Sequence, residues 1–143
     1  MASRHLSIRI DPESFERLER ESSRMQLSRS EAARTLIEEG LRMHAHPGIA
    51  FNPGPTGRRA VVMGGPDVWE LIGGFPEGDF SDEAVKYVAQ SLLLPEWKVR
   101  AGLRYYSEFR DEIDDRIRLN DEAAERGYAE WLQAQEAVTN QAH

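Results

Sequence analysis

Side chains that could bind DNA are regularly spaced near the N-terminus of this chain. Every second residue of segment 4–10 is apolar, and the residues between them are His5, Ser7 and Arg9. Because side chains alternate across a β-strand, a strand here would present these three groups on one face. Imidazole, hydroxyl and guanidinium groups can form hydrogen bonds with base edges in the major groove of DNA. The sequence therefore predicts that this face makes base contacts.

The opposite face of the predicted strand is formed by Leu6, Ile8 and Ile10. A single strand cannot bury such a face, and its backbone edge stays unpaired in water. The same strand from a second copy would cover the apolar face and pair with the backbone edge. The two strands would form an antiparallel ribbon narrow enough to enter the major groove. We therefore expect a homodimer that forms through segment 4–10.

Two helices are predicted to follow the strand. Asp11 and Pro12 are typical of a helix start, and a second start is indicated by Ser28 with Glu31 three residues later. In the first helix Phe15, Leu18, Ser22 and Met25 recur at helical spacing. In the second, one apolar stripe is formed by Ala33, Leu36, Ile37, Gly40 and Leu41. The second start, Ser28-Arg29-Ser30, offers backbone N–H groups and an arginine, which suit a DNA phosphate. An ordinary helix cap is the alternative interpretation.

Residues 4–46 together resemble a ribbon-helix-helix domain of the Arc, MetJ and CopG kind. The resemblance implies an intertwined homodimer that binds operator DNA. It implies base contacts for His5, Ser7 and Arg9, and phosphate contacts for the Ser28-Arg29-Ser30 turn. Where many members have a glycine between the two helices, this chain has Met25-Gln26-Leu27. The alternative is a fragment of an α+β core.

The central segment is predicted to contain a short hairpin, a short apolar helix over 68–72 and two further helices. Residues 52–57 are dense in turn formers, and Ser81 and Pro95 mark helix starts. In the helix after Pro95 one face is apolar, and the residues on the other face are Trp97, Lys98, Arg100 and Arg104. This face is a possible second surface for DNA or a protein partner, although a solvated outer face is equally typical of surface helices.

The stretch from His46 to Asp115 resembles a small helix-turn-helix domain of unknown function found in bacterial and archaeal antitoxins. The segments that carry the resemblance are 46–49, 57–59, 66–69 and 94–106. Members of that family follow a ribbon-helix-helix segment and lie beside genes for PIN-like toxins. The resemblance therefore implies a VapB-like antitoxin of a type II toxin–antitoxin system.

The last segment is predicted to be an acidic helix that binds a protein. Residues 105–143 hold ten Asp or Glu and four Lys or Arg, which gives most of the net charge of -7. The apolar residues proposed to contact the toxin are Ala124, Tyr128, Trp131 and Leu132. The carboxylates could cover a basic RNA-binding approach, or Arg116, Arg118 and Arg126 could enter the acidic site of a ribonuclease. Gly127 weakens the helix, and packing against its own domain is the alternative.

Composition excludes several other classes. The 143 residues contain no cysteine, so disulfides and thiolate sites are excluded. Neither a membrane-spanning run nor a signal peptide is seen, so we expect a cytoplasmic protein. No catalytic, nucleotide-binding or metal-ligand motif is present, and we expect no enzyme activity, cofactor or metal. His44 and His46 are two apart, which is poor spacing for one helical face.

We therefore predict a mainly α fold: a ribbon-helix-helix domain over 1–46, a helix-turn-helix-like domain with a short hairpin over 47–107, and an acidic helical tail over 108–143. The predicted function is that of an antitoxin that represses its own operon and neutralises a PIN-like ribonuclease. The alternative is a stand-alone regulator of transcription whose C-terminal half dimerises or senses a ligand.

Overall fold

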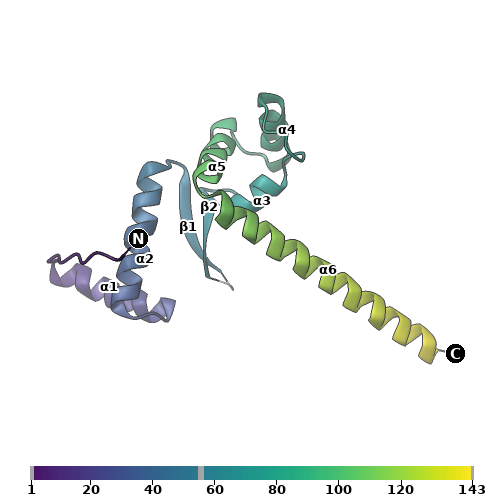
Figure 1. The fold of residues 1–143 in the computed structure, drawn as a ribbon, viewed down its shortest axis with the longest axis horizontal. Helices are drawn as coiled ribbons and strands as arrows, with labels where there is room; N and C mark the ends of the chain where they lie inside the picture. The colour runs from purple at the N-terminus through teal and green to yellow at the C-terminus, as the bar shows by residue number, and fades with distance from the viewer. Residues whose placement is uncertain (1, 55–56, 143) are drawn as a thin grey trace. The chain divides into compact units, whose positions relative to one another are not determined.

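The computed structural model describes residues 2–54 and 57–142, and these are mainly helical (Figure 1). The chain divides into two compact units, Met1–Ala45 and His46–His143, which we call the N-terminal unit and the C-terminal unit. The sheet of the described residues is a two-stranded antiparallel hairpin in the C-terminal unit. The predicted mainly helical fold with a short hairpin is thus confirmed, and the finer ribbon-helix-helix and helix-turn-helix arrangements stay predictions. The predicted tail, residues 108–143, falls within the C-terminal unit.

The N-terminal unit is a pair of helices, α1 (Pro12–Met25) and α2 (Arg29–Ala45), packed against each other. At the start of α1 the Asp11 carboxylate accepts a hydrogen bond from the Ser14 backbone N–H at 2.8 Å. This bond holds the pKa of Asp11 below its ordinary value. Gln26, with φ 57°, takes the left-handed position that ends α1. A glycine is therefore not needed at this turn.

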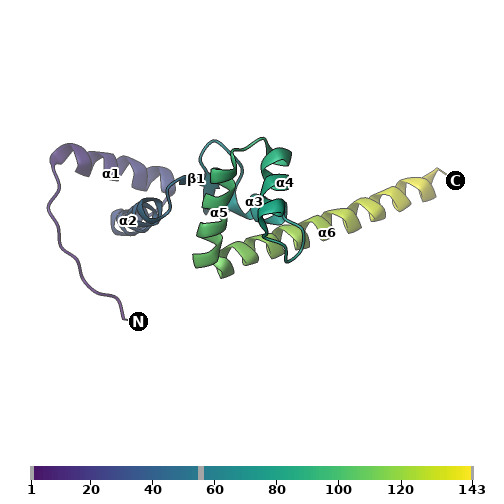
Figure 2. The same cartoon turned by 90° about the horizontal axis from the view of Figure 1, so that it is seen from above.

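Residues 2–11 form no helix or strand in this single chain, and Figure 2 shows them as an irregular trace before α1. The strand predicted for residues 4–10 is thus not formed by one copy. A strand exists only when its backbone pairs with another strand, and the described N-terminal unit contains none. Pairing with a second copy stays a prediction.

The C-terminal unit begins with the hairpin. Strands β1 (Ile49–Gly54) and β2 (Gly57–Val62) pair antiparallel, with Ile49 opposite Val62 and Gly54 opposite Gly57. Four helices follow: α3 (Val68–Gly73), α4 (Asp82–Leu92), α5 (Glu96–Glu108) and α6 (Arg110–Gln141). The predicted helix starts at Ser81 and Pro95 are confirmed, and the Ser81 hydroxyl accepts a hydrogen bond from the Ala84 N–H.

The core of the C-terminal unit is built around α5, which packs against α3, α4, α6 and both strands. Tyr105 on α5 is fully buried, together with Leu71, Val62 and Val99. Gly102 lies where α5 meets α3, and a Cβ atom there would be 2.9 Å from the Leu71 Cδ2 atom. The short side chain therefore lets α3 and α5 approach closely.

Helix α6 packs against α3 and α5 with its first part only. Ile113 is buried and Ile117 is half-buried, but every described residue from Ala123 onward is exposed. Figures 1 and 2 both show α6 leaving the other elements of its unit and continuing alone. No helix within residues 2–54 and 57–142 combines the length and the apolar character needed to span a membrane.

Candidate nucleic-acid and protein-binding surfaces

The predicted base-contacting residues His5, Ser7 and Arg9 are all exposed, on a segment without regular structure. The apolar residues between them are exposed too: Leu6 by 69%, Ile8 by 64% and Ile10 by 45%. One copy of the chain therefore leaves both faces of the alternating segment uncovered. Leaving three large apolar side chains of one short segment in water is costly, which favours an apolar partner for them.

The turn between α1 and α2 carries the predicted phosphate-binding residues. Ser28 and Glu31 form the predicted capping box: the Ser28 hydroxyl accepts from the Glu31 N–H at 3.2 Å, and the Ser28 N–H donates to the Glu31 carboxylate at 3.3 Å. The N–H groups of Ser28 and Glu31 are thus engaged within the chain. The backbone N–H groups of Arg29 and Ser30 are left at the exposed start of α2, where the positive end of the helix dipole favours an anion.

Arg29 is held across this turn. Its guanidinium lies 3.1 Å from the Glu19 carboxylate and 4.6 Å from the centre of the Phe15 ring. Both members of the ion pair are about half exposed, so the pair contributes at most about 1 kcal/mol. A phosphate could replace Glu19 as the partner of Arg29 at little cost.

The outer face of α5 is less basic than the sequence suggests. Arg100 forms ion pairs with Asp82 at 3.0 Å and with Glu96 at 3.9 Å. Lys98 is half-buried, with its Nζ atom 5.7 Å from the centre of the Trp97 ring. Asp82 and Glu96, the acidic neighbours of Arg100, weaken the case for a phosphate-binding surface on α5.

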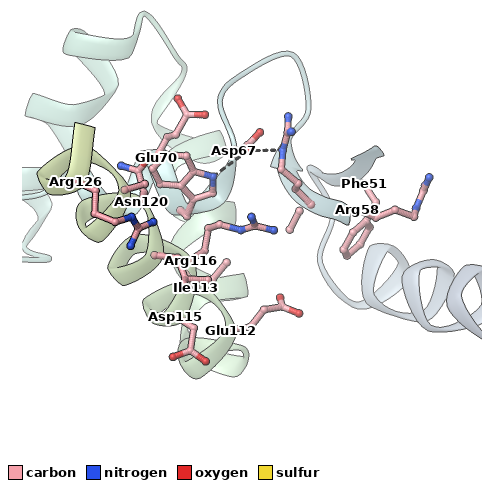
Figure 3. Close-up of a pocket in the computed structure, with 15 residues that line it drawn as sticks. Phe51, Arg58, Asp67, Glu70, Glu112, Ile113, Asp115, Arg116, Asn120 and Arg126 are labelled. Atoms are coloured by element: carbon pink, nitrogen blue, oxygen red, sulfur yellow. Dashed lines mark hydrogen bonds and ion pairs between the residues drawn. The ribbon is translucent and has the colours of Figure 1, made fainter. Parts of the chain in front are cut away.

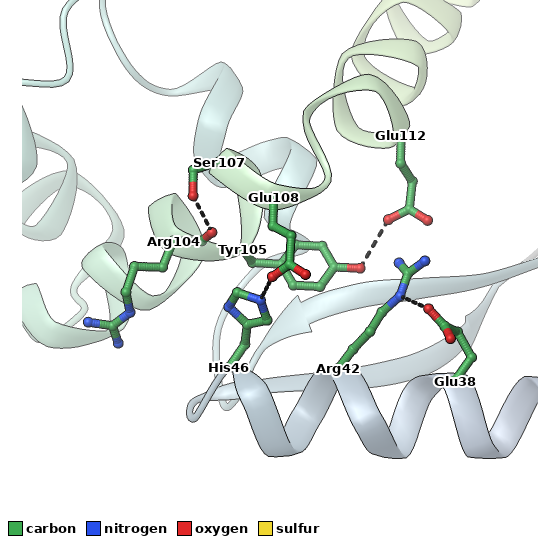
Figure 4. Close-up of polar contacts among 8 residues, drawn as sticks. All are labelled: Glu38, Arg42, His46, Arg104, Tyr105, Ser107, Glu108 and Glu112. Atoms are coloured by element: carbon green, nitrogen blue, oxygen red, sulfur yellow. Dashed lines mark hydrogen bonds and ion pairs between the residues drawn. The ribbon is translucent and has the colours of Figure 1, made fainter.

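Trp97 and Arg104 complete the predicted α5 surface. The Trp97 ring is 54% exposed, and its inner edge covers Gly48, where a Cβ atom would lie 3.0 Å from the ring. Gly48 has φ +96°, so no side chain is favoured there. Arg104 is exposed (Figure 4). The two side chains are accessible, but they lie on different turns and form no single cluster.

The residues predicted to contact a protein partner, Ala124, Tyr128, Trp131 and Leu132, are all exposed on the last part of α6. The Tyr128 and Trp131 rings stack at 5.9 Å between centres, and they are 63% and 55% exposed. Most helical stability in proteins comes from packing of one face, and Gly127 weakens this part of α6 further. The segment therefore presents aromatic anchors that are more than half exposed among residues 2–54 and 57–142.

The acidic residues of the last segment are concentrated before this exposed part. Only Glu130 and Glu136 of the ten carboxylates follow Gly127. Two of the earlier ones support the core, because Tyr105 donates a hydrogen bond to Glu112 at 3.0 Å and Tyr106 donates to Asp114 at 2.6 Å. Burial and the bond to Asp114 raise the pKa of Tyr106 above its ordinary value. Sequence periodicity could not reveal this structural role.

A groove that the sequence did not indicate opens between the hairpin, α3 and α6 (Figure 3). Its volume is about 860 Å³, and apolar side chains such as Phe51, Ile113 and Leu119 form part of its wall. Four arginines and four carboxylates also line it: Arg58, Arg59, Arg116, Arg126, Asp67, Glu70, Glu112 and Asp115. The signs balance, so the groove has no strong preference for an anion or a cation.

Asp67 organises one wall of the groove. Its carboxylate is buried, accepts a hydrogen bond from the Trp69 indole N–H at 3.0 Å, and lies 2.6 Å from the Arg59 Nε atom. The Arg59 contact is an ion pair without hydrogen-bond geometry at Nε. Asp67 therefore links β2 to α3.

His46 is packed into the same unit rather than being available as a metal ligand. Its ring is buried against the edges of Tyr105 and Phe109, and its Nε2 atom lies 2.5 Å from a Glu108 carboxylate oxygen (Figure 4). Within the described part of the chain, no three His, Asp or Glu side chains are grouped so that they could hold a metal ion.

Comparisons with protein-family models, with curated proteins and with solved structures gave no match to this chain.

Proposed function

We propose that this protein is an antitoxin that binds operator DNA as a dimer and neutralises a toxin protein, a PIN-like ribonuclease. The observation that supports it best is the pair of uncovered apolar surfaces at opposite ends of the chain. One lies on segment 4–10 and the other on the last part of α6. A protein with two such surfaces in two compact units is suited to two different partners.

For DNA binding, the pattern of the N-terminal unit supplies the argument. If Leu6, Ile8 and Ile10 of two copies pack together in a ribbon, the side chains left outside are His5, Ser7 and Arg9. These can read bases, while the exposed start of α2, with Arg29, binds the neighbouring phosphate. The arrangement is that of a ribbon-helix-helix repressor.

For toxin binding, the last part of α6 supplies the argument. Ala124, Tyr128, Trp131 and Leu132 can enter an apolar groove on a partner as an amphipathic helix. Tryptophan and tyrosine are the residues that most often dominate the binding energy of a protein interface. Ordering of this helix on binding is part of the proposal, because its described residues from Ala123 onward are all exposed.

The DNA proposal is tested with Arg9→Ala on the DNA upstream of the protein's own gene. We expect operator affinity to fall by about 1 to 3 kcal/mol and specificity to relax, as for loss of a base contact. Arg17→Ala, an exposed arginine on α1, is the matched control and should leave binding unchanged. Measurement is by fluorescence anisotropy at fixed salt. Equal losses on operator and unrelated DNA would make Arg9 a phosphate contact.

The toxin proposal is tested by co-expression with the product of the neighbouring gene. We expect that product to arrest growth alone and to be harmless when this protein is present. Trp131→Ala should restore toxicity, whereas Gln133→Ala, a change at an exposed position two residues away, should not. A neighbouring product that is harmless alone, or toxic despite this protein, contradicts the antitoxin function.

A second candidate is a stand-alone regulator whose C-terminal unit senses a ligand. The groove of about 860 Å³ between the hairpin, α3 and α6 favours it, because its size is typical of small-molecule sites. A harmless neighbouring product together with retained operator binding would favour this candidate.

A further inference from the structure

The last part of α6 carries one continuous row of side chains at alternating spacings of four and three residues. We call this row the tail seam: Ala124, Tyr128, Trp131, Gln135, Val138 and Ala142. Such spacing is that of the core positions of a two-stranded coiled coil. Tyr128, Trp131 and Val138 are 63%, 55% and 70% exposed, so the side chains of the seam are available for contact with a second helix.

The positions that flank the seam indicate what kind of helix can lie on it. Five of the six are uncharged, and the sixth is Glu125: the full set is Glu125, Gly127, Leu132, Ala134, Thr139 and Gln141. Flanking charges normally select a partner of opposite charge, or repel an identical helix. Here Glu130 and Glu136 lie on the outer side, so two identical seams can meet without repulsion.

The seam is also complementary to itself when two helices run in opposite directions. With the two-fold centre at residue 133, Trp131 lies beside Gln135 of the second copy and Tyr128 lies beside its Val138. The Trp131 and Tyr128 layers then each pair a larger side chain with a smaller one, and in the end layers Ala124 meets Ala142. The Gln135 amide oxygen can accept the hydrogen bond of the Trp131 indole N–H, which would otherwise be left without a partner in the seam.

The position of the C-terminal unit favours antiparallel over parallel pairing of two α6 helices. The seam continues the face on which Ile113 and Ile117 pack against α3 and α5, because all these residues share one side of α6. In a parallel pair, both C-terminal units would occupy the space between the two helices. In an antiparallel pair the second helix overlaps only residues 124–142, all of which are exposed in the part of the chain that the structure describes.

We infer that the tail seams of two copies pair as an antiparallel coiled coil over residues 124–142. Because this face is the one given above to the toxin, the inference rests on the proposed function for its meaning: the second copy holds the surface until a toxin displaces it. The pairing itself needs no toxin, so it can be tested on this protein alone.

The chain contains no cysteine, so a single introduced thiol can form a disulfide only with another copy. Ala134→Cys places a thiol beside the seam, one residue from the two-fold centre. In the proposed pair this thiol lies near the equivalent thiol of the second copy. Gln133→Cys, the matched control, places it on the opposite side of the helix. Under mild oxidation of the full chain, we expect Ala134→Cys to cross-link at least about tenfold faster than Gln133→Cys, because pairing raises the effective thiol concentration.

Direction is tested with Ala124→Cys and Ala142→Cys. An antiparallel pair predicts cross-linking only when the two variants are mixed, and a parallel pair predicts it within each variant alone. Adding Trp131→Ala to Ala134→Cys should abolish the excess cross-linking, with helix content checked by circular dichroism. Equal rates for Ala134→Cys and Gln133→Cys overturn the inference, and they leave the toxin proposal to its own co-expression test.

Discussion

Two glycines in the helices of the C-terminal unit show how one residue type can have opposite effects. Gly102 on α5 lies against Leu71 in the core, whereas Gly127 on α6 has nothing within 4 Å of the position of a Cβ atom. A glycine within a helix costs about 0.5 to 1 kcal/mol relative to alanine. At Gly102 the absence of a side chain lets α3 and α5 pack closely, which compensates for the cost. At Gly127 no packing compensates for it.

We expect Gly102→Val to lower the free energy of unfolding by about 1 to 3 kcal/mol, because the larger side chain overfills the contact between α3 and α5. Gly127→Ala, the matched control, should instead increase the helix signal at 222 nm. Urea unfolding and circular dichroism measure the two effects. A Gly102→Val variant as stable as the parent chain would contradict the close packing seen here.

Tyr106 makes the stability depend on pH at the alkaline end. Its pKa is raised in the folded state by burial and by the hydrogen bond to Asp114, so the unfolded chain loses this proton at lower pH. The stabilising effect is therefore complete below about pH 10 and is lost as the pH rises through the folded pKa. In an absorbance titration at 295 nm, the late tyrosine ionisation of the wild type should be smaller by one tyrosine in Tyr106→Phe. Identical titration curves would contradict this prediction.

At the scale of elements, Asp67 joins the hairpin to α3. It stands at the N-cap position of α3, yet its side chain makes no capping hydrogen bond. The carboxylate is instead directed to Arg59 on β2 and to the Trp69 indole. One buried charge thus fixes the angle at which the chain passes from strand to helix, and with it one wall of the groove.

Asp67→Ala is expected to destabilise the C-terminal unit by about 1 to 3 kcal/mol, because it removes hydrogen bonding to a buried charge and leaves Arg59 without its partner. Arg59→Ala in the same chain should restore part of the loss, since the unpaired cation is then gone. Thermal unfolding of both variants and of the single Arg59→Ala variant gives the coupling energy. Additive losses would show that the two residues do not interact.

Local signals in the sequence predicted the helix starts well. Asp11, Ser28 with Glu31, and Ser81 act within three residues of themselves, so their patterns are readable without the fold. Contacts between distant segments were not readable. Nothing in the sequence around Tyr105 or Asp67 marks one as the centre of the core or the other as the link between β2 and α3.

For the candidate sites too, contacts between distant segments could not be predicted from the sequence. His5, Ser7 and Arg9 are exposed, but so are Leu6, Ile8 and Ile10, so the exposure of segment 4–10 does not distinguish its two predicted faces. The basic face of α5 was overestimated, because the ion pair of Arg100 with Asp82 joins residues that are 18 positions apart. The strand predicted for segment 4–10 is not formed here, because the described N-terminal unit contains no strand to pair with it.

At the scale of the whole molecule, the two units differ in their cores. The C-terminal unit has an apolar core, and the described part of the N-terminal unit has almost none. The C-terminal unit buries a cluster of apolar residues from both strands and four helices. In the described part of the N-terminal unit, Ala32 is the only buried apolar residue.

A fragment consisting of residues 46–143 should therefore fold on its own. We expect it to keep the near-ultraviolet circular dichroism signal of its buried tyrosines and to unfold in one cooperative transition. The full chain provides the reference spectrum. A fragment without fixed tertiary signal would show that the C-terminal unit depends on residues 1–45.

The single buried apolar residue of the N-terminal unit has a consequence for regulation. On the proposal that the N-terminal unit gains its core by pairing, the amount of paired unit varies with the square of the concentration of free chains. While unpaired chains predominate, halving the amount of protein then lowers the amount of paired unit about fourfold. The proposed occupancy of a DNA site by such a pair would respond steeply to small changes in synthesis.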